Sequence, residues 1–341
     1  SELLESWNRV LVSIRERWPS LYEFEEDMAT KVGPLSVMKP LQERLPDVRS
    51  YYDDILLSSN SVLYSAVAAV RREWSPARGM QVRTQQRTVE LMKKSTNSGS
   101  PYFTKRRNVV EKTVPASIRQ RNTMGPTQFL PGFKGSACAI IGWRGQEGGH
   151  SKEDVKQRVV WMFPFAVNVA ELQVYQVLIE AAQRFDIVPA WVSMESVDRH
   201  ITALFDTKGS DDLVICTDFS KFDQHFNTSL QTVAESLLGS LFNSSVGSWL
   251  ENIFPIKYNI PIALDLKDGF LKMYRGEHGM GSGSGGTNAD ETLAHRALQY
   301  EAAILNKSRL NLNSMCLGDD GVLTYPGITV KDVVDAYSKH G

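Results

Sequence analysis

Apolar residues recur at helical spacing through several long stretches of the chain. One example is the first stretch, where Leu3, Leu4, Trp7, Val10, Leu11 and Ile14 are spaced to share one helix face. Residues 1–75 are therefore predicted to be mostly helical, with side chains that serve packing. The same spacing predicts further helices over residues 166–184, 228–242, 288–305 and 330–339.

Short apolar runs bounded by turn residues predict strands between these helices. Two probable hairpins are 137–143 with 157–163, joined by a polar loop, and 260–266 with 270–274, separated by Lys267-Asp268-Gly269. A third lies in residues 314–325, and a single run, 213–217, leads into Asp218. Between residues 97 and 132, clusters of Gly and Pro predict loops.

Length and composition leave room for a large core and exclude several classes of protein. A chain of 341 residues allows roughly two domains or one composite unit. Its 42% hydrophobic and 23% charged content argues against disorder, collagen and coiled coil. We expect a soluble, non-secreted protein, because no apolar run is long enough to span a bilayer and the N-terminal residues do not resemble a signal peptide. The three cysteines, Cys138, Cys216 and Cys316, lack metal-site spacing and are expected to pack in core strands.

Positive charge is concentrated in one part of a chain whose formal net charge is −1. Residues 71–122 contain 13 Lys and Arg against three Glu. A solvated helix face would explain some of this excess, but a surface for phosphate contacts explains it better.

Carboxylates stand at two places where strands are expected to end. Asp319 and Asp320 lie in the Gly-Asp-Asp-Gly turn of the last hairpin, which could be an ordinary Asp-Gly turn. Asp218 ends the run 213–217, and Asp223 follows five residues later, where it could instead cap the next helix. If the strand before Asp218 pairs beside the hairpin, three carboxylates converge. Such a cluster favours two Mg²⁺ ions that catalyse in-line phosphoryl transfer.

Two further segments fit a nucleotide site. The Gly/Ser run 279–287 could be a linker, but it leads directly into a packing helix, so we expect its backbone to approach a sugar-phosphate chain. The hairpin 137–163 carries Lys152, Lys156 and Arg158 near its distal end, a weak indication of a polyphosphate site.

These motifs together resemble those of viral RNA-dependent RNA polymerases. Asp218 and Asp223 resemble motif A, Ser282-Gly283 and Thr287 motif B, Gly318-Asp319-Asp320 motif C, and Lys156-Gln-Arg158 motif F. The residues of motifs A and B are most similar to those of picobirnavirus polymerases. The resemblance implies an α+β right-hand fold, with fingers at residues 1–165 and a palm at 166–341. The palm would contain an antiparallel sheet flanked by helices and be interrupted by a fingers insertion around 243–278.

The resemblance also implies roles for individual residues. Asp218 and Asp319 would bind the catalytic metals, Mg²⁺ or Mn²⁺ in its place, with Asp320 supporting them. Asp223 would read the ribose 2′-hydroxyl. Lys156 and Arg158 would hold the triphosphate, and the motif B loop with Ser282, Gly283, Thr287 and Asn288 would position nucleotide and template. The basic region would bind RNA, in particular through Arg83, Arg87, Lys105, Arg106 and Arg107.

Two departures from the family pattern stand out. Many relatives place an asparagine four residues after the motif B threonine, where this chain has Glu291; Asn288 directly follows Thr287 instead, so the partner of Asp223 stays open. The sequence also stops inside the expected motif D helix, before a thumb. We therefore expect a truncated or partly ordered form with little processive synthesis, and we assign no general acid to Lys339.

Two other functions would explain part of the sequence. A reverse transcriptase shares the two-metal palm but carries a bulky aromatic residue at the position of Asp223. A non-catalytic RNA-binding particle protein would explain the basic region but not the converging acids. The resemblance implies a monomeric enzyme inside a double-stranded RNA virus particle in the host cytoplasm, with RNA, NTPs and capsid protein as partners and no membrane. His225 and His295 are expected to be packing or surface residues.

Overall fold

The computed structural model describes residues 2–36, 38–56, 59–120, 124–146, 155–266 and 270–341. It divides into two compact units, Ser1–Val48 with Gly142–Val160, and Arg49–Ile141 with Trp161–Gly341. These units do not follow the expected boundary between fingers and palm at residue 165. The assignment of those functional domains therefore stays a prediction.

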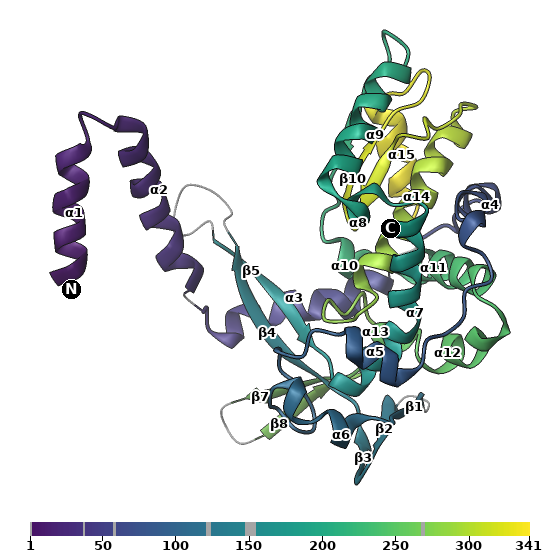
Figure 1. Ribbon diagram of the computed structural model, residues 1–341, viewed down its shortest axis with the longest axis horizontal. Coiled ribbons are helices and arrows are strands. Elements are labelled where there is room, and N and C mark those ends of the chain that lie inside the picture. Colours follow the sequence, from purple (N-terminus) through teal and green to yellow (C-terminus); the bar gives the residue numbers. More distant parts are fainter. Residues whose placement is uncertain (1, 37, 57–58, 121–123, 147–154, 267–269) are drawn as a thin grey trace. The chain divides into compact units, whose positions relative to one another are not determined.

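The first unit is built from N-terminal helices and the distal part of a hairpin. Helices α1 (Glu2–Ile14) and α2 (Pro19–Ser36) pack against each other (Figure 1), and α3 (Leu41–Asp53) begins in this unit. Strands β4 (Ala139–Gln146) and β5 (Lys156–Met162) form the predicted hairpin, with their distal residues in this unit. Lys156 and Arg158 are exposed on β5, whereas Lys152 lies outside the described residues.

The second unit contains the longest buried helices. The predicted helices are confirmed as α7 (Phe165–Arg184), α11 (Thr228–Leu241), α14 (Thr287–Leu305) and α15 (Val330–Ser338). Both α7 and α14 bury residues on most of their circumference, as expected of helices inside a large core. The remaining helices are α4 (Tyr64–Glu73), α5 (Gln85–Leu91), α6 (Val110–Thr113), α8 (Pro189–Val192), α9 (Met194–Thr207), α10 (Phe222–His225), α12 (Gly247–Asn252) and α13 (Ile256–Asn259).

Three 3₁₀ turns, η1 (Asp54–Leu56), η2 (Ser75–Ala77) and η3 (Arg106–Asn108), and a fourth, η6 (Ser244–Val246), connect these elements. None of the helices formed by the described residues combines the length and the apolar character needed to cross a bilayer.

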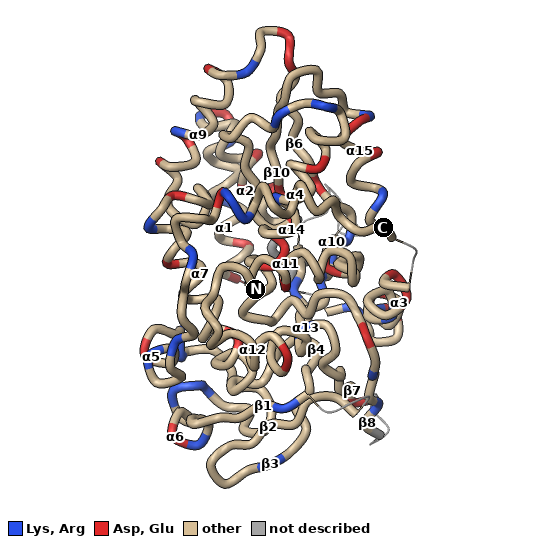
Figure 2. Tube along the Cα trace, turned by 90° about the vertical axis from the view of Figure 1, so that its right-hand side faces the viewer, with Lys and Arg blue, Asp and Glu red and all other residues tan. Residues whose placement is uncertain are grey.

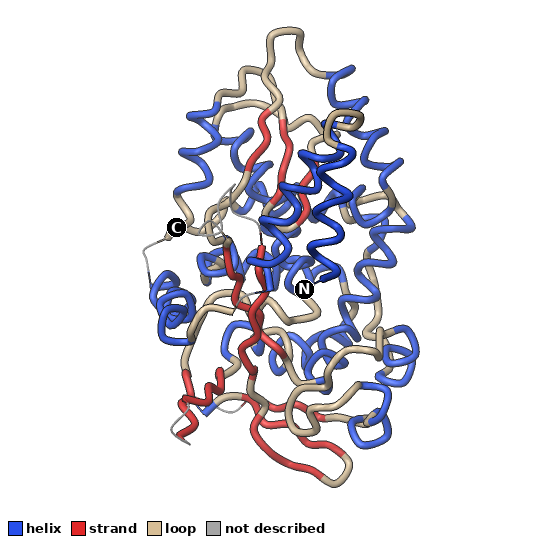
Figure 3. The backbone as a smooth tube through the Cα atoms, turned by 90° about the vertical axis from the view of Figure 1, so that its left-hand side faces the viewer, coloured by secondary structure: helices blue, strands red, loops and turns tan. Residues whose placement is uncertain are grey.

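A central antiparallel sheet lies at the core of the second unit. It consists of β6 (Ile215–Thr217), β9 (Met315–Leu317) and β10 (Asp320–Leu323), with β10 in the middle. The register pairs Gly321 with both Thr217 and Cys316. Figure 3 shows these strands among helices, well separated from the sheet formed by β1, β2 and β3. The prediction that the strand before Asp218 pairs beside the last hairpin is thus confirmed.

Apolar side chains fix helices against this central sheet. Ile215 and Leu323 of the sheet share a buried cluster with Ala302 of α14 and Val333 of α15. Because each buried aliphatic side chain contributes about 1.5–3 kcal/mol, the helices hold the sheet in place without help from the polar groups at its edge.

Two other sheets complete the fold. Strands β1 (Ser117–Gln120), β2 (Pro126–Leu130) and β3 (Phe133–Ser136) form an antiparallel meander where we expected loops only, so that expectation was wrong. The predicted hairpin of β7 (Ile262–Leu266) and β8 (Phe270–Tyr274) is confirmed, although its turn, 267–269, lies outside the described residues. Strand β7 pairs in parallel with β4 at Ala139 and Ile140, a contact that no local pattern indicates.

Candidate active site

The two neighbouring aspartates of the last hairpin occupy different positions in it. Because Asp320 pairs with Leu317, the turn consists of Gly318 and Asp319 alone. Gly318 has a φ of +57°, which a two-residue hairpin turn requires and which favours glycine. Asp319 is therefore at the tip, and Asp320 is the exposed first residue of β10. The Asp-Gly pair is not the turn, because Gly321 lies inside the strand.

Helix α14 binds this turn through two side-chain hydrogen bonds. The hydroxyl of Thr292 accepts a hydrogen bond from the backbone N–H of Gly318 at 2.9 Å. Nδ1 of His295 donates to the carbonyl oxygen of Gly318 at 2.8 Å. His295 is fully buried, and burial lowers its pKa to about 4, so it is neutral at physiological pH. The predicted packing role of His295 is confirmed, and both polar groups of Gly318 are satisfied by one helix.

The carboxylates of motifs A and C are brought together at this end of the sheet. Asp218 directly follows β6, whose last residue pairs with Gly321 of β10. The pKa of Asp319 is raised, first by burial and then by the negative charges of Asp320, Asp218 and Asp223. Burial thus contributes most to the raised pKa, and the three neighbouring carboxylates add to it.

The described side chains do not by themselves form a closed metal-binding set. Among them, no group of three or more His, Cys, Asp or Glu side chains is arranged around one point. Carboxylate oxygens at a site open to solvent nevertheless match the donors of Mg²⁺, which takes few protein ligands and completes its shell with water and substrate phosphates.

Asp223 has a partner that the sequence left open. It lies in α10 and does not cap the following helix, because the Asn227 side chain accepts from the N–H groups of Ser229 and Leu230 there. The carboxyl of Glu291 lies beside that of Asp223. Burial, then Asp223 itself and the other nearby negative charges, raise the pKa of Glu291 well above its ordinary value.

Asn288, the other candidate partner of Asp223, hydrogen-bonds other residues. Its side-chain oxygen accepts from Nε1 of Trp191 at 2.8 Å. A weaker contact of 3.5 Å joins the same oxygen to the hydroxyl of Thr292. A role for Asn288 in nucleotide binding stays a prediction.

The Gly/Ser loop before α14 is fixed by close contacts with the protein. Ser282 accepts from the backbone N–H of Trp161, and Thr287 donates to the carbonyl oxygen of Gly281. A Cβ on Gly283 would lie 1.5 Å from the carbonyl oxygen of Trp161, so only glycine fits there. This need for glycine comes from contact with the protein, and contact with a ligand stays a prediction.

Glu171 is a functional candidate that the sequence did not indicate. It is completely buried in α7 and accepts hydrogen bonds from Ser284 Oγ and from the backbone N–H of Gly285. Burial raises its pKa, against the opposing effect of the Lys257 charge. The sequence of this helix did not single out Glu171, because Glu180 and several amide side chains lie in the same helix.

The predicted RNA-binding cations differ in their exposure and in whether they pair with other side chains. Arg83 binds Glu180 and Gln176, Arg87 pairs with Glu90 on the surface, and half-buried Arg106 donates to Asn168. Lys105 and Arg107 are exposed. Figure 2 shows basic residues gathered near α5 and α6. Exposed cations of this kind suit contacts with phosphates, and the RNA-binding role itself stays a prediction.

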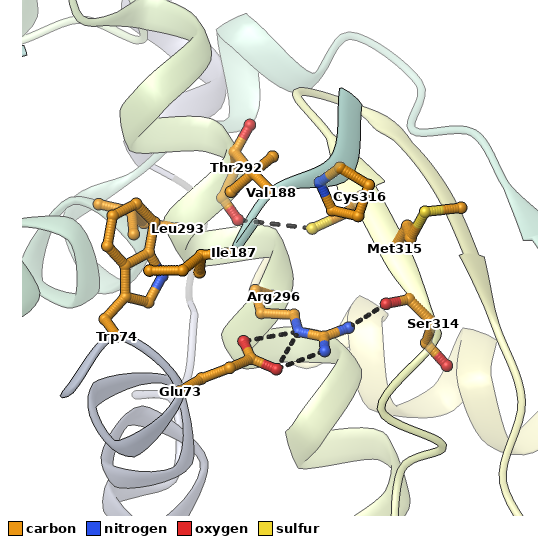
Figure 4. A pocket seen from close by; sticks show the side chains of 11 residues that line it. Glu73, Trp74, Ile187, Val188, Thr292, Leu293, Arg296, Ser314, Met315 and Cys316 are labelled. Atoms are coloured by element: carbon orange, nitrogen blue, oxygen red, sulfur yellow. Dashed lines mark hydrogen bonds and ion pairs between the residues drawn. The ribbon is translucent and has the colours of Figure 1, made fainter. Parts of the chain in front are cut away.

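A small cavity beside α14 and β9 is distinct from the carboxylate site (Figure 4). It measures about 20 Å³, enough for roughly one water molecule, and none of Asp218, Asp319 and Asp320 lines it. In its wall Arg296 binds the carboxylate of Glu73 and the carbonyl oxygen of Ser314. This cavity belongs to the packing that joins α4, α14 and the start of β9.

The cysteines are only partly as expected. Cys316 is buried in β9, Cys138 is half-buried, and Cys216 is exposed on β6. The prediction of core packing was therefore wrong for Cys216, whose side chain is exposed although its neighbour Ile215 on the same strand is buried.

Comparisons with known proteins identify the family of this chain. A family profile described as viral RNA-dependent RNA polymerase matches residues 149–339. A protein of human picobirnavirus named "Potential RNA-dependent RNA polymerase" is 55% identical over 340 residues, which cover 99% of this chain and 63% of that relative. The chain thus spans less than two thirds of the relative's length.

Solved structures show the same similarity. The crystal structure of the RNA-dependent RNA polymerase of a human picobirnavirus has a TM-score of 0.87 and 55% identity, covering 99% of this chain and 64% of that one. The structure of its insertion loop deletion mutant has a TM-score of 0.87 and 56% identity, and the match covers 98% of this chain and 66% of that one. The Sicinivirus 3Dpol polymerase, at 11% identity and a TM-score of 0.61 over 85% of this chain and 64% of that one, shares the fold. Fold, carboxylate site and sequence together place this chain in the viral RNA-dependent RNA polymerase family.

Proposed function

We propose that this chain carries the catalytic centre for template-directed RNA synthesis from nucleoside triphosphates. The observation that supports this most directly is the pairing of β6 with β10, which brings Asp218 beside the turn that carries Asp319. Two carboxylates from distant parts of the sequence then share one solvent-facing edge. A non-catalytic RNA-binding protein has no need of such a pair, since carboxylates repel phosphates unless a cation intervenes.

Asp218 and Asp319 would hold the divalent ions, Mg²⁺ or Mn²⁺, with Asp320 beside them. The donor set fits such ions because its atoms are carboxylate oxygens and because burial, and then the charges of Asp320, Asp218 and Asp223, raise the pKa of Asp319. When bound, a metal pair activates the attacking hydroxyl and stabilises the leaving oxygen in phosphoryl transfer.

Other residues of the chain would bind and orient the substrates. Asp223 would accept a hydrogen bond from the ribose 2′-hydroxyl, which favours ribonucleotides over deoxyribonucleotides. The loop 282–287 would support the nucleotide and template, and exposed Lys156 and Arg158 would bind the triphosphate. The exposed basic residues near α5 and α6 would contact RNA phosphates.

The biological setting follows from the resemblance to picobirnavirus polymerases. We propose that the substrate is a double-stranded viral RNA genome, copied and transcribed within the particle in the host cytoplasm. Capsid protein would then be the partner of a monomeric enzyme.

The test is single-nucleotide incorporation into a primed RNA template, with the variant Asp319→Asn. We expect incorporation to fall by at least about 1,000-fold while salt-sensitive RNA binding is kept, because the amide has the carboxylate's shape without its charge. A matched control is Asp335→Asn, since Asp335 is an exposed residue of α15 paired only with Lys331 on the same helix. Undiminished incorporation by Asp319→Asn refutes the catalytic assignment. Equal use of ribo- and deoxyribonucleotides by the wild-type chain refutes the sugar-reading role of Asp223.

A further inference from the structure

The Gly/Ser loop before α14 is bound by two side chains of α7 that lie one helical turn apart. Asn168 and Glu171 are only 4% and 0% exposed. Nδ2 of Asn168 donates to the carbonyl oxygen of Gly283 at 3.2 Å. Glu171 accepts from the hydroxyl of Ser284 and, at 3.1 Å, from the backbone N–H of Gly285. One face of one helix thus binds three successive residues of the loop.

The donors around Glu171 explain why a carboxylate occupies this buried position. A third donor, Nδ2 of Asn168, reaches Oε1 of Glu171 at 3.0 Å. A carboxylate offers only acceptors, so it satisfies all three donors at once. The amide of Asn168 is itself held in one orientation, because its Oδ1 accepts from Arg106 at 2.6 Å. Arg106, a predicted RNA contact, therefore uses part of its guanidinium within the protein.

The hydrogen bond from Ser284 to Glu171 orders the loop beyond Ser284. Oγ of Ser284 also accepts from the backbone N–H of Gly286 at 3.0 Å. Thr287 then closes the loop by donating to the carbonyl oxygen of Gly281 at 3.1 Å. The backbone up to the start of α14 thus depends on where the Ser284 hydroxyl is held.

The ends of the loop lie beside both segments that carry the acidic residues. At its start, the backbone N–H of Met280 donates to the carbonyl oxygen of Asp223 at 2.8 Å. At its end, Nδ2 of Asn288, the second residue of α14, lies 3.3 Å from where a Cβ on Gly318 would be. A shift of the loop would therefore disturb the proposed active site on two sides.

We propose that Glu171, oriented by Asn168, is a positioning residue that anchors the Gly/Ser loop in the conformation that supports nucleotide and template. The inference rests on the proposed polymerase function. The hydrogen bonds of Glu171 go to the loop and to Asn168, so its effect on the reaction passes through the loop. Without the carboxylate, the donors of Ser284 and Gly285 lose their acceptor and the loop samples other conformations. A substrate misplaced by a small distance can react about a hundredfold more slowly.

The activity test compares Glu171→Ala with Glu171→Gln in single-nucleotide incorporation. We expect Glu171→Ala to lower kcat/KM for the incoming nucleotide by about tenfold or more. The amide of Glu171→Gln keeps an acceptor for the N–H of Gly285 and offers an N–H to Oγ of Ser284, so kcat/KM should stay within about threefold of wild type. The control Glu251→Ala changes an exposed residue of α12 and should leave kcat/KM unchanged. An unchanged kcat/KM in Glu171→Ala, or an equal loss in both Glu171 variants, overturns the proposal.

Hydrogen-exchange mass spectrometry tests the anchor without activity. The backbone N–H groups of Gly285 and Gly286 bond to Glu171 and to Oγ of Ser284, so a peptide covering residues 279–287 reports on the anchor directly. In Glu171→Ala, exchange in this peptide should become about tenfold faster or more, with no change in a reference peptide from β2 and β3, residues 126–136. Unchanged exchange in the loop peptide overturns the proposal. Equal acceleration in both peptides shows a general loss of stability and also overturns it.

Ser284→Ala decides the question if Glu171→Ala does not fold. This variant removes the same hydrogen bond from the side of the half-buried loop and leaves the side chains of α7 in place. Exchange in the 279–287 peptide should again be faster than in wild type, and unchanged exchange overturns the proposal. Faster loop exchange in these variants, together with a wild-type chain that incorporates no nucleotide, supports the anchor and counts against the polymerase function alone.

Discussion

Thr292→Val tests whether α14 holds the turn that carries Asp319. The substitution keeps the side-chain shape and removes the hydroxyl that accepts the N–H of Gly318 at 2.9 Å. Thr292 is only 2% exposed, and Gly318 is buried, so water does not replace the lost acceptor. A buried donor left without a partner costs about 1–3 kcal/mol. The turn should therefore open more easily, although the contact of His295 with the Gly318 carbonyl remains.

Hydrogen-exchange mass spectrometry of a peptide that covers residues 314–323 measures this effect directly. If the turn opens locally, a loss of 1–3 kcal/mol makes exchange in this peptide about 5- to 150-fold faster. Nucleotide incorporation should fall as well, since Asp319 loses its fixed position.

The matched control is Thr232→Val on α11. Its hydroxyl donates to the carbonyl of Thr228 within the same helix and is exposed, so stability should change by less than about 0.5 kcal/mol. If exchange in the 314–323 peptide of Thr292→Val matches that of wild type, the hydrogen bond does not hold the turn and our reasoning is wrong.

Three further predictions concern charge. In the absence of divalent cations, Asp319→Asn should raise the Tm, because burial and then repulsion from neighbouring carboxylates disfavour the charged Asp319 and raise its pKa. Mn²⁺ should then raise the Tm of wild type more than that of the variant, as differential scanning fluorimetry would detect. Burial lowers the pKa of His340, but its hydrogen bonds to Glu301 and to the backbone of Asn60, together with the Glu301 charge, outweigh this and raise the pKa overall. The pair of His340 and Glu301 thus stabilises the fold fully at a pH below the unfolded-state pKa of about 6.5. This stabilisation is lost as the pH rises through the pKa of His340 in the folded state. An NMR titration midpoint of His340 at or below about 6.5 would contradict the prediction. Replacing Lys105 or Arg107 with Ala should reduce the slope of log affinity for RNA against log salt by about 0.7–0.9 each, and an unchanged slope in fluorescence anisotropy assigns them no phosphate contact.

Local sequence patterns were sufficient for the elements around the site. The helix after Asp223 and the hairpin around Asp319 have apolar spacing that matches their buried faces, so their existence followed from periodicity alone. Their pairing followed from a physical requirement, since carboxylates of motifs A and C are useful only if their strands are neighbours.

Other features depend on contacts between distant residues. Asn227 and Asp223 are both good capping residues, and only the position at which α11 begins decides between them. Cys216 is exposed although its neighbour Ile215 is buried, a difference between the two faces of the strand that a continuous apolar run does not reveal. The partner of Asp223 depended on the rotation of α14, which turns Glu291 toward α10 and Asn288 toward Trp191.

The hold of α14 on Gly318 has a consequence for motion in this chain. Since Thr292 and His295 bind the turn from one continuous helix, a movement of α14 carries the turn with Asp319 along unless buried hydrogen bonds break. The Gly/Ser loop before α14 is held in the same way, because Ser282 accepts from the N–H of Trp161 and Gly283 lies against the Trp161 carbonyl. Loop, helix and turn are therefore expected to move together as one rigid body.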